Sequence, residues 1–448
     1  MRHPYVPNAA DAPRREMLDA IGLPDMDALY KDIPCALRLG RPLQMPPRIA
    51  SEAALERHVT ELLAKNVPCS KALSFLGAGC YQRHIPAVCE EIANRSEFRS
   101  AYAGEPYDDF GRFQALFEYE SLMGELLDCD VVNVPAMDGA QAAATAIRMA
   151  ERMTGRRIAL VSTDIHPDKK RIIQNYATPA MDIRFASPER LASALDESCA
   201  CVYVESPSFL GVIPANLRAL SDIAHGVGAE MIVGCEPSLL GVLESPMNLG
   251  ADIVTGDIQS LGNPMNYGGS QAGFIGTRDE TRYVSQYPSR LFGITRTEVA
   301  GEYGFGDVAY ERTSFADRAH AKEYVGTQAA LMGITAGVYL ALMGPDGMRT
   351  LGKRLFSSAA YLKKRLAALP GVRLPFAHSA NEFVVDFTQT GKTVGEISDA
   401  LYLKGIYPGF DLTRDFPELG QSMLVCASEI HEQCDLDRLI DALSEVLQ

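Results

Sequence analysis

The sequence predicts an α/β protein in three parts: a helical arm, a large domain built on a mainly parallel sheet, and a smaller α+β domain. Two patterns carry this prediction. From Asp130 onward, short apolar strands alternate with helices, which is typical of parallel strands joined by helical crossovers. Before that point, residues 1–70 contain apolar residues at helical spacing but no strand. We expect the arm and its loops at 1–128, the large domain at 129–311 and the small domain at 312–448.

The composition is that of an ordinary globular chain. Its 448 residues, 47% hydrophobic and 22% charged, allow two or three domains with a buried core. The formal net charge is −15 and there is no basic run, so we expect no nucleic-acid partner. No run of 18 apolar residues occurs and the N-terminus lacks an apolar signal core, so we expect no membrane partner.

The cysteines and histidines suggest neither disulfides nor a metal site. The ten cysteines are scattered without a CxxC pair, and we interpret them as reduced core residues of a cytoplasmic protein. Cys199 and Cys201 lie two apart at the start of a strand and should therefore share one face of it. The eight histidines are isolated and no HExxH motif occurs, so we expect no metal.

The arm should contain two main helices. Ala9–Ile21 has helical spacing, with Asp11 able to cap it and Pro13 in the first turn. Ser51–Lys65 reads as an amphipathic helix with Ser51 as its cap. Its apolar stripe consists of Leu55, Val59, Leu62 and Leu63. We expect the arm to pack on a larger body or on another chain.

Two loops stand out between the arm and the sheet. Ser74–Tyr81 reads SFLGAGCY, and its two glycines favour a tight turn. A helix at 84–94 follows, then an aromatic-rich loop at 95–113, then a helix at Phe113–Leu127. The aromatic side chains of that loop would either line a pocket or pack beneath the loop.

The large domain should follow as alternating elements. The expected strands are Val131–Val134, Arg157–Val161, Asp182–Phe185, Cys201–Val204 and Glu230–Val233. The expected helices between them lie at 139–153, 166–176, 188–196 and 216–226. The first strand–helix junction is a small-residue turn whose N–H groups could face an anion. Asp138 puts a negative charge there, which counts against a phosphate. Capping of the helix is its favoured role, with substrate contact across an interface as the alternative.

One stretch organises the functional argument. Residues 251–277, ADIVTGDIQSLGNPMNYGGSQAGFIGT, should form strands at Asp252–Thr255 and Gln271–Gly276 around a loop rich in Gly, Pro, Asn and Ser. Enzymes that hold pyridoxal phosphate as a Schiff base need a lysine on such a loop. The chain has no lysine between positions 170 and 322. The loop offers instead the polar side chains of Asp257, Gln259 and Asn266.

The last third should be helical and then α+β. Residues 278–320 read as an irregular segment with recurrent arginines and aromatic residues. The elements expected after it are helices at Tyr324–Met343 and Gly344–Leu369, strands at Glu382–Asp386 and Ser422–Val425, and helices at Val394–Lys404 and Cys434–Leu447. An arm, a large α/β domain and a small α+β domain describe the architecture of fold-type-I pyridoxal phosphate enzymes, the aspartate aminotransferase-like fold.

Four stretches resemble the P-protein of glycine cleavage. They are PNAADAPRREMLDAIGLPDMDALYKDIP, SFLGAGCYQRHIPAVCEEIANRSEFRSAY, QALFEYESLMGELLDCDVVNVPAMDGAQAAATAI and YGGSQAGFIGT. The likeness covers nearly the whole chain in order. It is greatest to the separate N-terminal, or alpha, subunit of that family, which is subunit 1 of the decarboxylating glycine dehydrogenase.

The resemblance implies a chain with the fold of a pyridoxal phosphate enzyme but without the Schiff-base lysine. It implies that a beta chain, subunit 2, carries the cofactor and completes a shared active site in an α2β2 assembly. Such an assembly decarboxylates glycine and passes the aminomethyl group to a lipoyl carrier, the H-protein. This chain would then bind no cofactor covalently and would not be catalytic alone.

Two stretches leave the family pattern. Residues 103–111 read AGEPYDDFG where the family has a TPYQPE-type loop followed by SQG, and residues 312–328 replace a basic segment of the type REQHIRREKATSN. In the family these segments lie near the active site. Two alternatives to glycine decarboxylase therefore remain: a divergent paralogue in a pyridoxal phosphate complex that acts on another amino acid or amine, and a non-catalytic scaffold.

Four residues are candidates for lining a shared site: Tyr102, Glu105, Asp138 and Glu236. Glu236 occupies the strand end where fold-type-I enzymes place the aspartate that meets the pyridine nitrogen. If no cofactor binds, a structural or interface role is favoured for it. Gln259 lies near the position where the lysine would be expected. We interpret it by default as a polar loop residue without a special role. No catalytic side chain is expected on this chain.

Overall fold

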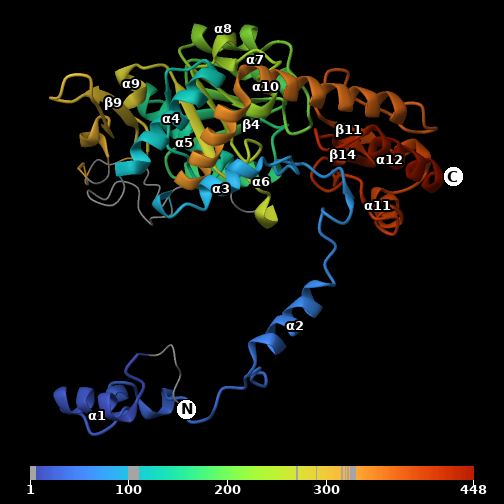
Figure 1. Cartoon of the computed structure of the whole chain (residues 1–448). Helices are drawn as coiled ribbons and strands as arrows, with labels where there is room; N and C mark the ends of the chain where they lie inside the picture. Colours follow the sequence, from blue (N-terminus) through green and yellow to red (C-terminus); the bar gives the residue numbers. More distant parts are fainter. Residues whose placement is uncertain are drawn as a thin grey trace. The chain divides into compact units, whose positions relative to one another are not determined.

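The computed structural model divides the chain into two compact units, Met1–Val67 and Pro68–Gln448 (Figure 1). The structure describes residues 7–98, 110–268, 271–288, 290–313, 316–317, 319, 322 and 329–448. Each unit is considered by itself. Within the described ranges, no helix combines the length and the apolar character needed to cross a membrane.

The first unit is helical, as predicted, and has almost no core. Its α-helices are α1 (Asp11–Ala20) and α2 (Glu52–Leu63). Leu18 is the single buried side chain among the described residues of this unit. The predicted apolar stripe of α2 is present but exposed. Ser51 occupies the N-cap of α2, although its side chain makes no capping hydrogen bond. Ala10, not Asp11, is the N-cap of α1.

The second unit is built on a seven-stranded sheet of order β2-β8-β7-β6-β5-β3-β4. The strands are β2 (Val131–Val132), β3 (Ile158–Ser162), β4 (Asp182–Ala186), β5 (Cys199–Ser206), β6 (Glu230–Cys235), β7 (Ile253–Asp257) and β8 (Gly273–Thr277). Strands β3 to β7 are parallel, whereas β8 runs antiparallel to both β7 and β2. The mainly parallel sheet predicted from the alternating pattern is therefore present.

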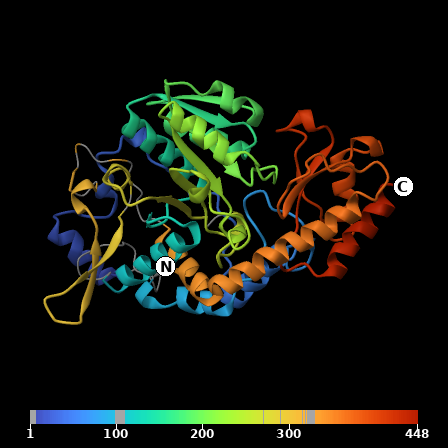
Figure 2. The ribbon, with the colours of Figure 1, turned by 90° about the horizontal axis from the view of Figure 1, so that it is seen from above.

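Helices cover both faces of the sheet (Figure 2). An apolar cluster of buried side chains lies at each face. One cluster contains side chains of α4 (Phe110–Leu127), α7 (Pro188–Ala194), α8 (Leu217–Gly226) and α10 (Ala330–Leu366). The other contains side chains of α5 (Gly139–Thr154) and α6 (Pro167–Ala177). Neighbouring residues of one strand alternate between the clusters, as the two-residue repeat of a strand requires.

Cys199 and Cys201 do not share a face, contrary to the prediction. Cys199 packs in the cluster with α8, and Cys201 packs in the cluster with α5. The cause is a break in register, because Ile158 of β3 pairs with Cys199 while the next residue, Ala159, pairs with Cys201. The extra residue on β5 is a bulge, and a bulge reverses the alternation of side chains beyond it.

The C-terminal part combines strands and helices, as expected, and its strands form a smaller antiparallel sheet. Its strands are β11 (Glu382–Asp386), β14 (Ser422–Cys426) and β13 (Phe410–Asp411), and its helices are α11 (Val394–Tyr402) and α12 (Gln433–Val446). Helix α10 leads into this region and bends at Gly344, which has a φ of 55°. Pro345 follows directly after this glycine. The bend coincides with the boundary between the two helices predicted there.

Residues 68–98 belong to the second unit. Strand β1 (Leu73–Ser74) pairs in parallel with β12 (Ile406–Tyr407), next to the C-terminal sheet, and α3 (Ala87–Ala93) packs on α10. The segment expected to be irregular after residue 278 contains α9 (Thr281–Val284) and a hairpin of β9 (Phe292–Arg296) and β10 (Tyr303–Asp307). The domain boundaries after residues 128 and 311 remain predictions.

Candidate functional site

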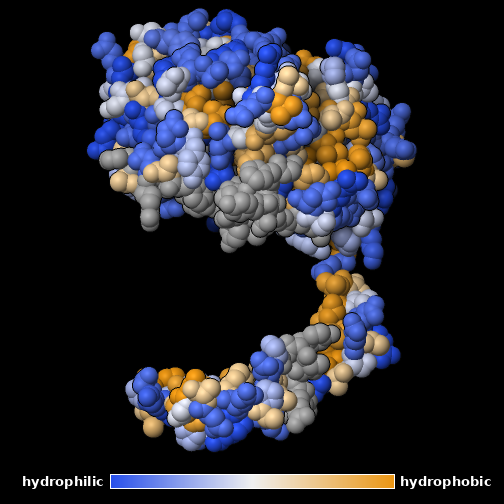
Figure 3. Space-filling model, turned by 60° about the vertical axis from the view of Figure 1, so that its left-hand side comes forward, coloured by the Kyte–Doolittle hydropathy of each residue, from blue (hydrophilic) through white to orange (hydrophobic). Residues whose placement is uncertain are grey.

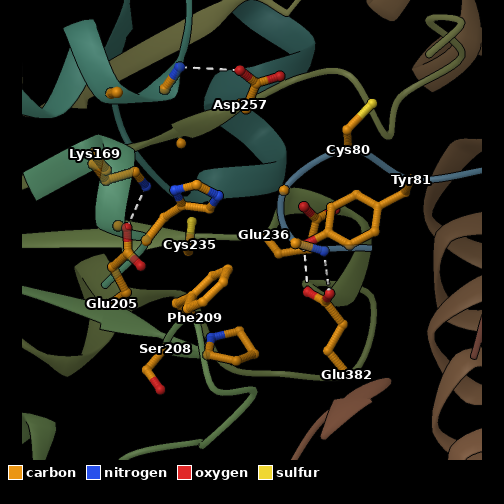
Figure 4. Close-up of a pocket in the computed structure, with 18 of the residues that line it drawn as sticks. Cys80, Tyr81, Lys169, Glu205, Ser208, Phe209, Cys235, Glu236, Asp257 and Glu382 are labelled. Carbon is orange, nitrogen blue, oxygen red and sulfur yellow. Dashed lines mark hydrogen bonds and ion pairs between the residues drawn. The ribbon is translucent and has the colours of Figure 1, made fainter. Parts of the chain in front are cut away.

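A cavity of about 440 Å³ opens at the carboxyl ends of the parallel strands (Figure 4). Ligands of open α/β sheets bind at this edge. The strands β5, β6 and β7 end at the cavity, and the start of α6, which follows β3, also lines it. The loop 78–81 and residues 380–382 of the C-terminal part close it from the other side. Long-range topology, not local sequence, brings these segments together.

Lys169 is the cationic side chain that lines the cavity. It lies in the first turn of α6. His166 is the N-cap of this helix, and its side chain accepts a hydrogen bond from the N–H of Asp168. Its ammonium group forms an ion pair with Glu205 near the end of β5, and the hydroxyl of Tyr203 donates to the same carboxylate at 2.9 Å. Burial alone would lower the pKa of Lys169, but the charges of Glu205, Tyr203 and Asp257, together with the hydrogen bond to Glu205, outweigh burial and raise the pKa. The amine is therefore held as an ammonium ion.

The N-terminus of α5 is occupied by the chain's own carboxylates. Asp138 caps the helix by accepting the N–H of Gln141 at 2.7 Å, so the predicted capping role is present. Asp257, at the end of β7, accepts the N–H of Gly139 at 3.0 Å. The first turn of a helix is a ready anion site because its N–H groups have no partner within the helix. Here two carboxylate oxygens fill that role.

Asp257 is held by three backbone donors and is deeply buried. Besides Gly139, it accepts the N–H of Gln259 at 2.8 Å and, more weakly, that of Ala272 at 3.4 Å. Burial raises the pKa of Asp257 to about 7; the backbone hydrogen bonds oppose this shift and the charge of Asp138 adds to it. Asp257 can therefore change its charge near neutral pH.

Glu236 follows β6 and lines the cavity. One oxygen of its carboxylate accepts the N–H of Ser238 at 3.2 Å and the hydroxyl of Ser238 at 2.6 Å. The same oxygen also accepts the hydroxyl of Ser260 from the loop after β7. These three donors fix the carboxylate between two neighbouring strand ends.

Glu382 of β11 connects the C-terminal sheet to the loop 78–81. Its two oxygens accept the N–H of Ala78 and the hydroxyl of Tyr81, each at 2.7 Å (Figure 4). Burial raises the pKa of Glu382 to about 7, against the effect of these hydrogen bonds and with a contribution from the charge of Glu236. The nearby Arg83 is occupied by Glu429 at 2.9 Å and by Ser238 at 3.2 Å.

Gln259 and Asn266 do not line the cavity. Gln259 is 2% exposed, and its side-chain amide joins both backbone groups of Tyr81, at 2.9 and 3.1 Å, to the carbonyl of Asn263 at 3.0 Å. The side chain at this position, near the expected lysine, therefore links the loop 78–81 to the loop after β7. Asn266 is exposed in a short turn with a φ of 44°.

The structure thus brings together three of the residues singled out in the sequence: Asp138, Glu236 and Asp257. Tyr102 and Glu105 lie outside the described residues. Five further cavity residues were not predicted from the sequence: His166, Lys169, Glu205, Tyr81 and Glu382. The position of Lys169 just after a predicted strand was an available signal. Glu382 had none, because its partner Tyr81 lies 301 positions away.

The whole chain is similar to one family. A family model described as "Glycine cleavage system P-protein" matches residues 3–443. The probable glycine dehydrogenase (decarboxylating) subunit 1 of Thermococcus onnurineus is 37% identical over 452 residues, which cover 99% of each chain. The corresponding protein of Sorangium cellulosum is 36% identical over 444 residues, 96% of each chain.

Solved structures show the same fold. A crystal structure of glycine decarboxylase (P-protein) of the glycine cleavage system, in inhibitor-bound form, has a TM-score of 0.86 and 32% identity, over 99% of this chain and 100% of that one. A sphingosine-1-phosphate lyase from Burkholderia pseudomallei has a TM-score of 0.65 at 14% identity, over 92% of this chain and 94% of that one. The latter likeness concerns the fold alone. The predicted fold-type-I class is confirmed.

Proposed function

The chain belongs to the P-protein family of the glycine cleavage system, and from this premise we propose that it is subunit 1 of a two-chain glycine decarboxylase. In this proposal a second chain carries pyridoxal phosphate, and the two complete one active site. The named relatives support the proposal, because they are subunits 1 and match this chain from end to end. The name subunit 1 also implies a partner chain, subunit 2.

The cavity of this chain does not fit pyridoxal phosphate, and this observation carries the proposal that the cofactor belongs to the partner. A Schiff base needs a neutral lysine amine, but the amine of Lys169 is held as an ammonium ion by Glu205. A phosphate needs open donors, but Asp138 and Asp257 occupy the N-terminus of α5. The described residues between β7 and β8 hold no lysine.

The reaction proposed for the assembled enzyme is the decarboxylation of glycine, followed by transfer of the aminomethyl group to a lipoyl carrier, the H-protein. Pyridoxal chemistry supplies the electron sink for the carbanion. This chain would contribute walls to the shared site. Tyr102, Glu105, Asp138 and Glu236 are the residues proposed for that role, and an α2β2 assembly in the cytoplasm is the proposed form.

The first unit supports the proposal of a partner chain. Figure 3 shows apolar side chains at its surface, and Leu37, Leu43 and Met45 are 76%, 65% and 73% exposed. Leu62 and Leu63 on α2 are 50% and 59% exposed. Soluble monomers rarely expose contiguous apolar surface of this kind, which typically marks a protein interface.

Reconstitution tests the proposal. The chain is purified alone and together with the beta-type subunit, and exchange of bicarbonate into the carboxyl group of glycine is measured with the lipoyl carrier present. We expect exchange by the pair and none by either chain alone. Equal exchange by the beta-type subunit alone would contradict the proposal and would favour the scaffold alternative.

The two departures from the family pattern favour one second candidate, a paralogue that acts on another amino acid or amine. Residues 103–109 and most of 312–328 lie outside the described residues, so their sequence alone carries this candidate. A panel of small amino acids offered to the reconstituted pair separates the two. Preference for a substrate other than glycine by a factor of ten or more in kcat/KM would favour the paralogue.

A further inference from the structure

The cavity of this chain has many hydrogen-bond acceptors and few free donors. Among the described residues, six carboxylates line it: Asp138, Asp168, Glu205, Glu236, Asp257 and Glu382. Against them stands the one lining ammonium group that the structure describes, that of Lys169, which Glu205 already neutralises. Figure 4 shows Glu205 on one side of the space and Glu236 and Glu382 on the other. A ligand in this cavity would therefore be close to negatively charged side chains on more than one wall.

Two lining side chains have acceptors to spare. Asn381 is only 3% exposed, and its amide nitrogen donates to the sulfur of Cys426 at 3.6 Å. Its amide oxygen accepts no hydrogen bond from the part of the chain that the structure describes. Likewise, one oxygen of Glu236 takes all three donors described above, and the other takes none from the described residues. These two oxygens can accept further hydrogen bonds inside the cavity, which favours a ligand that carries N–H donors.

The remaining walls, as far as the structure describes them, add no positive charge. Burial lowers the pKa of His166, which favours the neutral imidazole, and burial raises the pKa of Tyr81, which keeps the phenol neutral. The His166 ring lies 4.7 Å from the ring of Phe209 in an edge-on arrangement, and both line the cavity. Aromatic and apolar walls accept the carbon chain of an alkyl ammonium ion.

We propose that this cavity is a binding site for a small primary amine, bound as its ammonium ion and carrying no phosphate or carboxylate. The amine's N–H groups donate to Glu236 and Asn381, and its carbon chain packs on Phe209. Acidic groups are disfavoured because the helix N-terminus that would hold them is filled by Asp138 and Asp257. Every residue named for this site belongs to this chain, so binding can be measured on this chain alone.

The volume is consistent with that class of ligand. A space of about 440 Å³ is at the small end of the range of ligand pockets. It would take a chain of a few carbon atoms with one or two ammonium groups. A short diamine can meet Glu236 with one end and the opposite carboxylates with the other, so we expect it to bind more tightly than a monoamine of equal length.

Titration calorimetry on the full chain, without any partner, tests the proposal. The probes are putrescine, n-butylamine and inorganic phosphate in low-salt buffer at pH 8. We expect putrescine to bind at one site per chain, n-butylamine to bind more weakly, and phosphate not to bind. Because the attraction is ionic, affinity should fall as salt is added. No heat from either amine at millimolar concentration, or tighter binding of phosphate, would overturn the proposal.

Matched variants locate the site. Glu236→Gln and Asn381→Leu should each weaken putrescine binding at least tenfold, whereas Asp222→Asn, at an exposed position of α8, should leave it unchanged. Lys169→Gln removes the competing ammonium group and should tighten binding several-fold, a gain that a misfolded protein cannot produce. Unchanged affinity in both Glu236→Gln and Lys169→Gln would place any bound amine elsewhere and refute the proposal.

Discussion

At the scale of single residues, the buried carboxyl groups of the cavity are the most informative feature. Asp257 and Glu382 accept hydrogen bonds from backbone and tyrosine donors, yet burial raises the pKa of each to about 7. A carboxyl group with a raised pKa holds its proton in the folded state at a pH where the unfolded chain has lost it. Folding is then linked to proton uptake between about pH 4 and 7.

The first prediction follows from the sign of that linkage. In this window the native state binds more protons than the unfolded state, so the free energy of unfolding should fall as the pH rises. We expect Asp257→Asn to remove part of this slope, on the order of 2 kcal/mol between pH 5 and pH 8. Urea unfolding of the wild type and the variant at both values measures it. The titratable groups that interact with this carboxyl are Asp138, Lys169, Cys80 and Tyr119.

Glu382→Gln should flatten the same profile independently, because its partners Tyr81, Arg83, Cys426 and Glu236 differ from those of Asp257. If the free energy of unfolding fell with pH equally in the wild type and in both variants, the raised pKa values could not belong to these two groups.

Single residues also show what sequence reasoning can reach. The capping role of Asp138 was predictable because donor and acceptor lie three positions apart. The pairing of Lys169 with Glu205 was not, because 36 positions separate them and only the parallel order of β3 and β5 brings them together. Glu236 could be placed at a strand end from sequence, but its serine partners could not.

At the scale of elements, the junction of α5 with the sheet is tightly packed near the cavity. A Cβ on Gly273 of β8 would lie 2.0 Å from the carbonyl oxygen of Asp138, and one on Gly139 would lie 3.1 Å from the backbone of Gly256. The absence of side chains lets the helix start lie against the strand ends. That contact puts Asp257 within reach of the first N–H of α5.

The second prediction tests this contact. Gly273→Ala should destabilise the protein by about 3 kcal/mol, because the added methyl group meets backbone that cannot move without shifting a helix or a strand. Gly306→Ala in β10 is the matched control, since a Cβ there meets nothing within 4 Å. Thermal unfolding compares the two. Equal melting temperatures would mean that the α5 junction is looser than described.

Most elements were predictable from periodicity, and the exceptions have local causes. The sequence does not predict the hairpin of β9 and β10, because its strands, FGITR and YGFGD, are short, contain glycine and are only partly buried. The shared face expected for Cys199 and Cys201 failed because a bulge is invisible in a two-residue pattern. The two helices expected from Tyr324 were found, apart from the residues before 329, with their junction at Gly344.

At the scale of the whole molecule, the two units differ in what holds them together. Residues 68–448 contain the apolar clusters on both faces of the sheet and in the C-terminal part. The described residues of the first unit bury one side chain, Leu18. We expect a unit with so little core to gain stability from a surface on which it packs. The sequence analysis expects the same of the arm, and this stays a prediction.

The third prediction concerns that surface. Leu55→Asp combined with Leu62→Asp places two charges on the apolar stripe of α2 and should abolish co-purification with the beta-type subunit. The melting temperature of the isolated chain should change by less than 2 °C, because both side chains are about half exposed. Glu56→Gln on the same helix is the control and should pair normally. Normal pairing by the double variant would exclude the stripe from the interface.

The central claim is that this chain shares an active site without holding its cofactor. Borohydride reduction of the reconstituted pair, followed by peptide mass spectrometry, tests it most directly, because reduction fixes pyridoxal phosphate to whichever lysine carries it. We predict a modified lysine on the beta-type subunit and none on this chain, Lys169 included. A pyridoxyl group on Lys169, or on any lysine of this chain, in a stoichiometric amount would contradict the account.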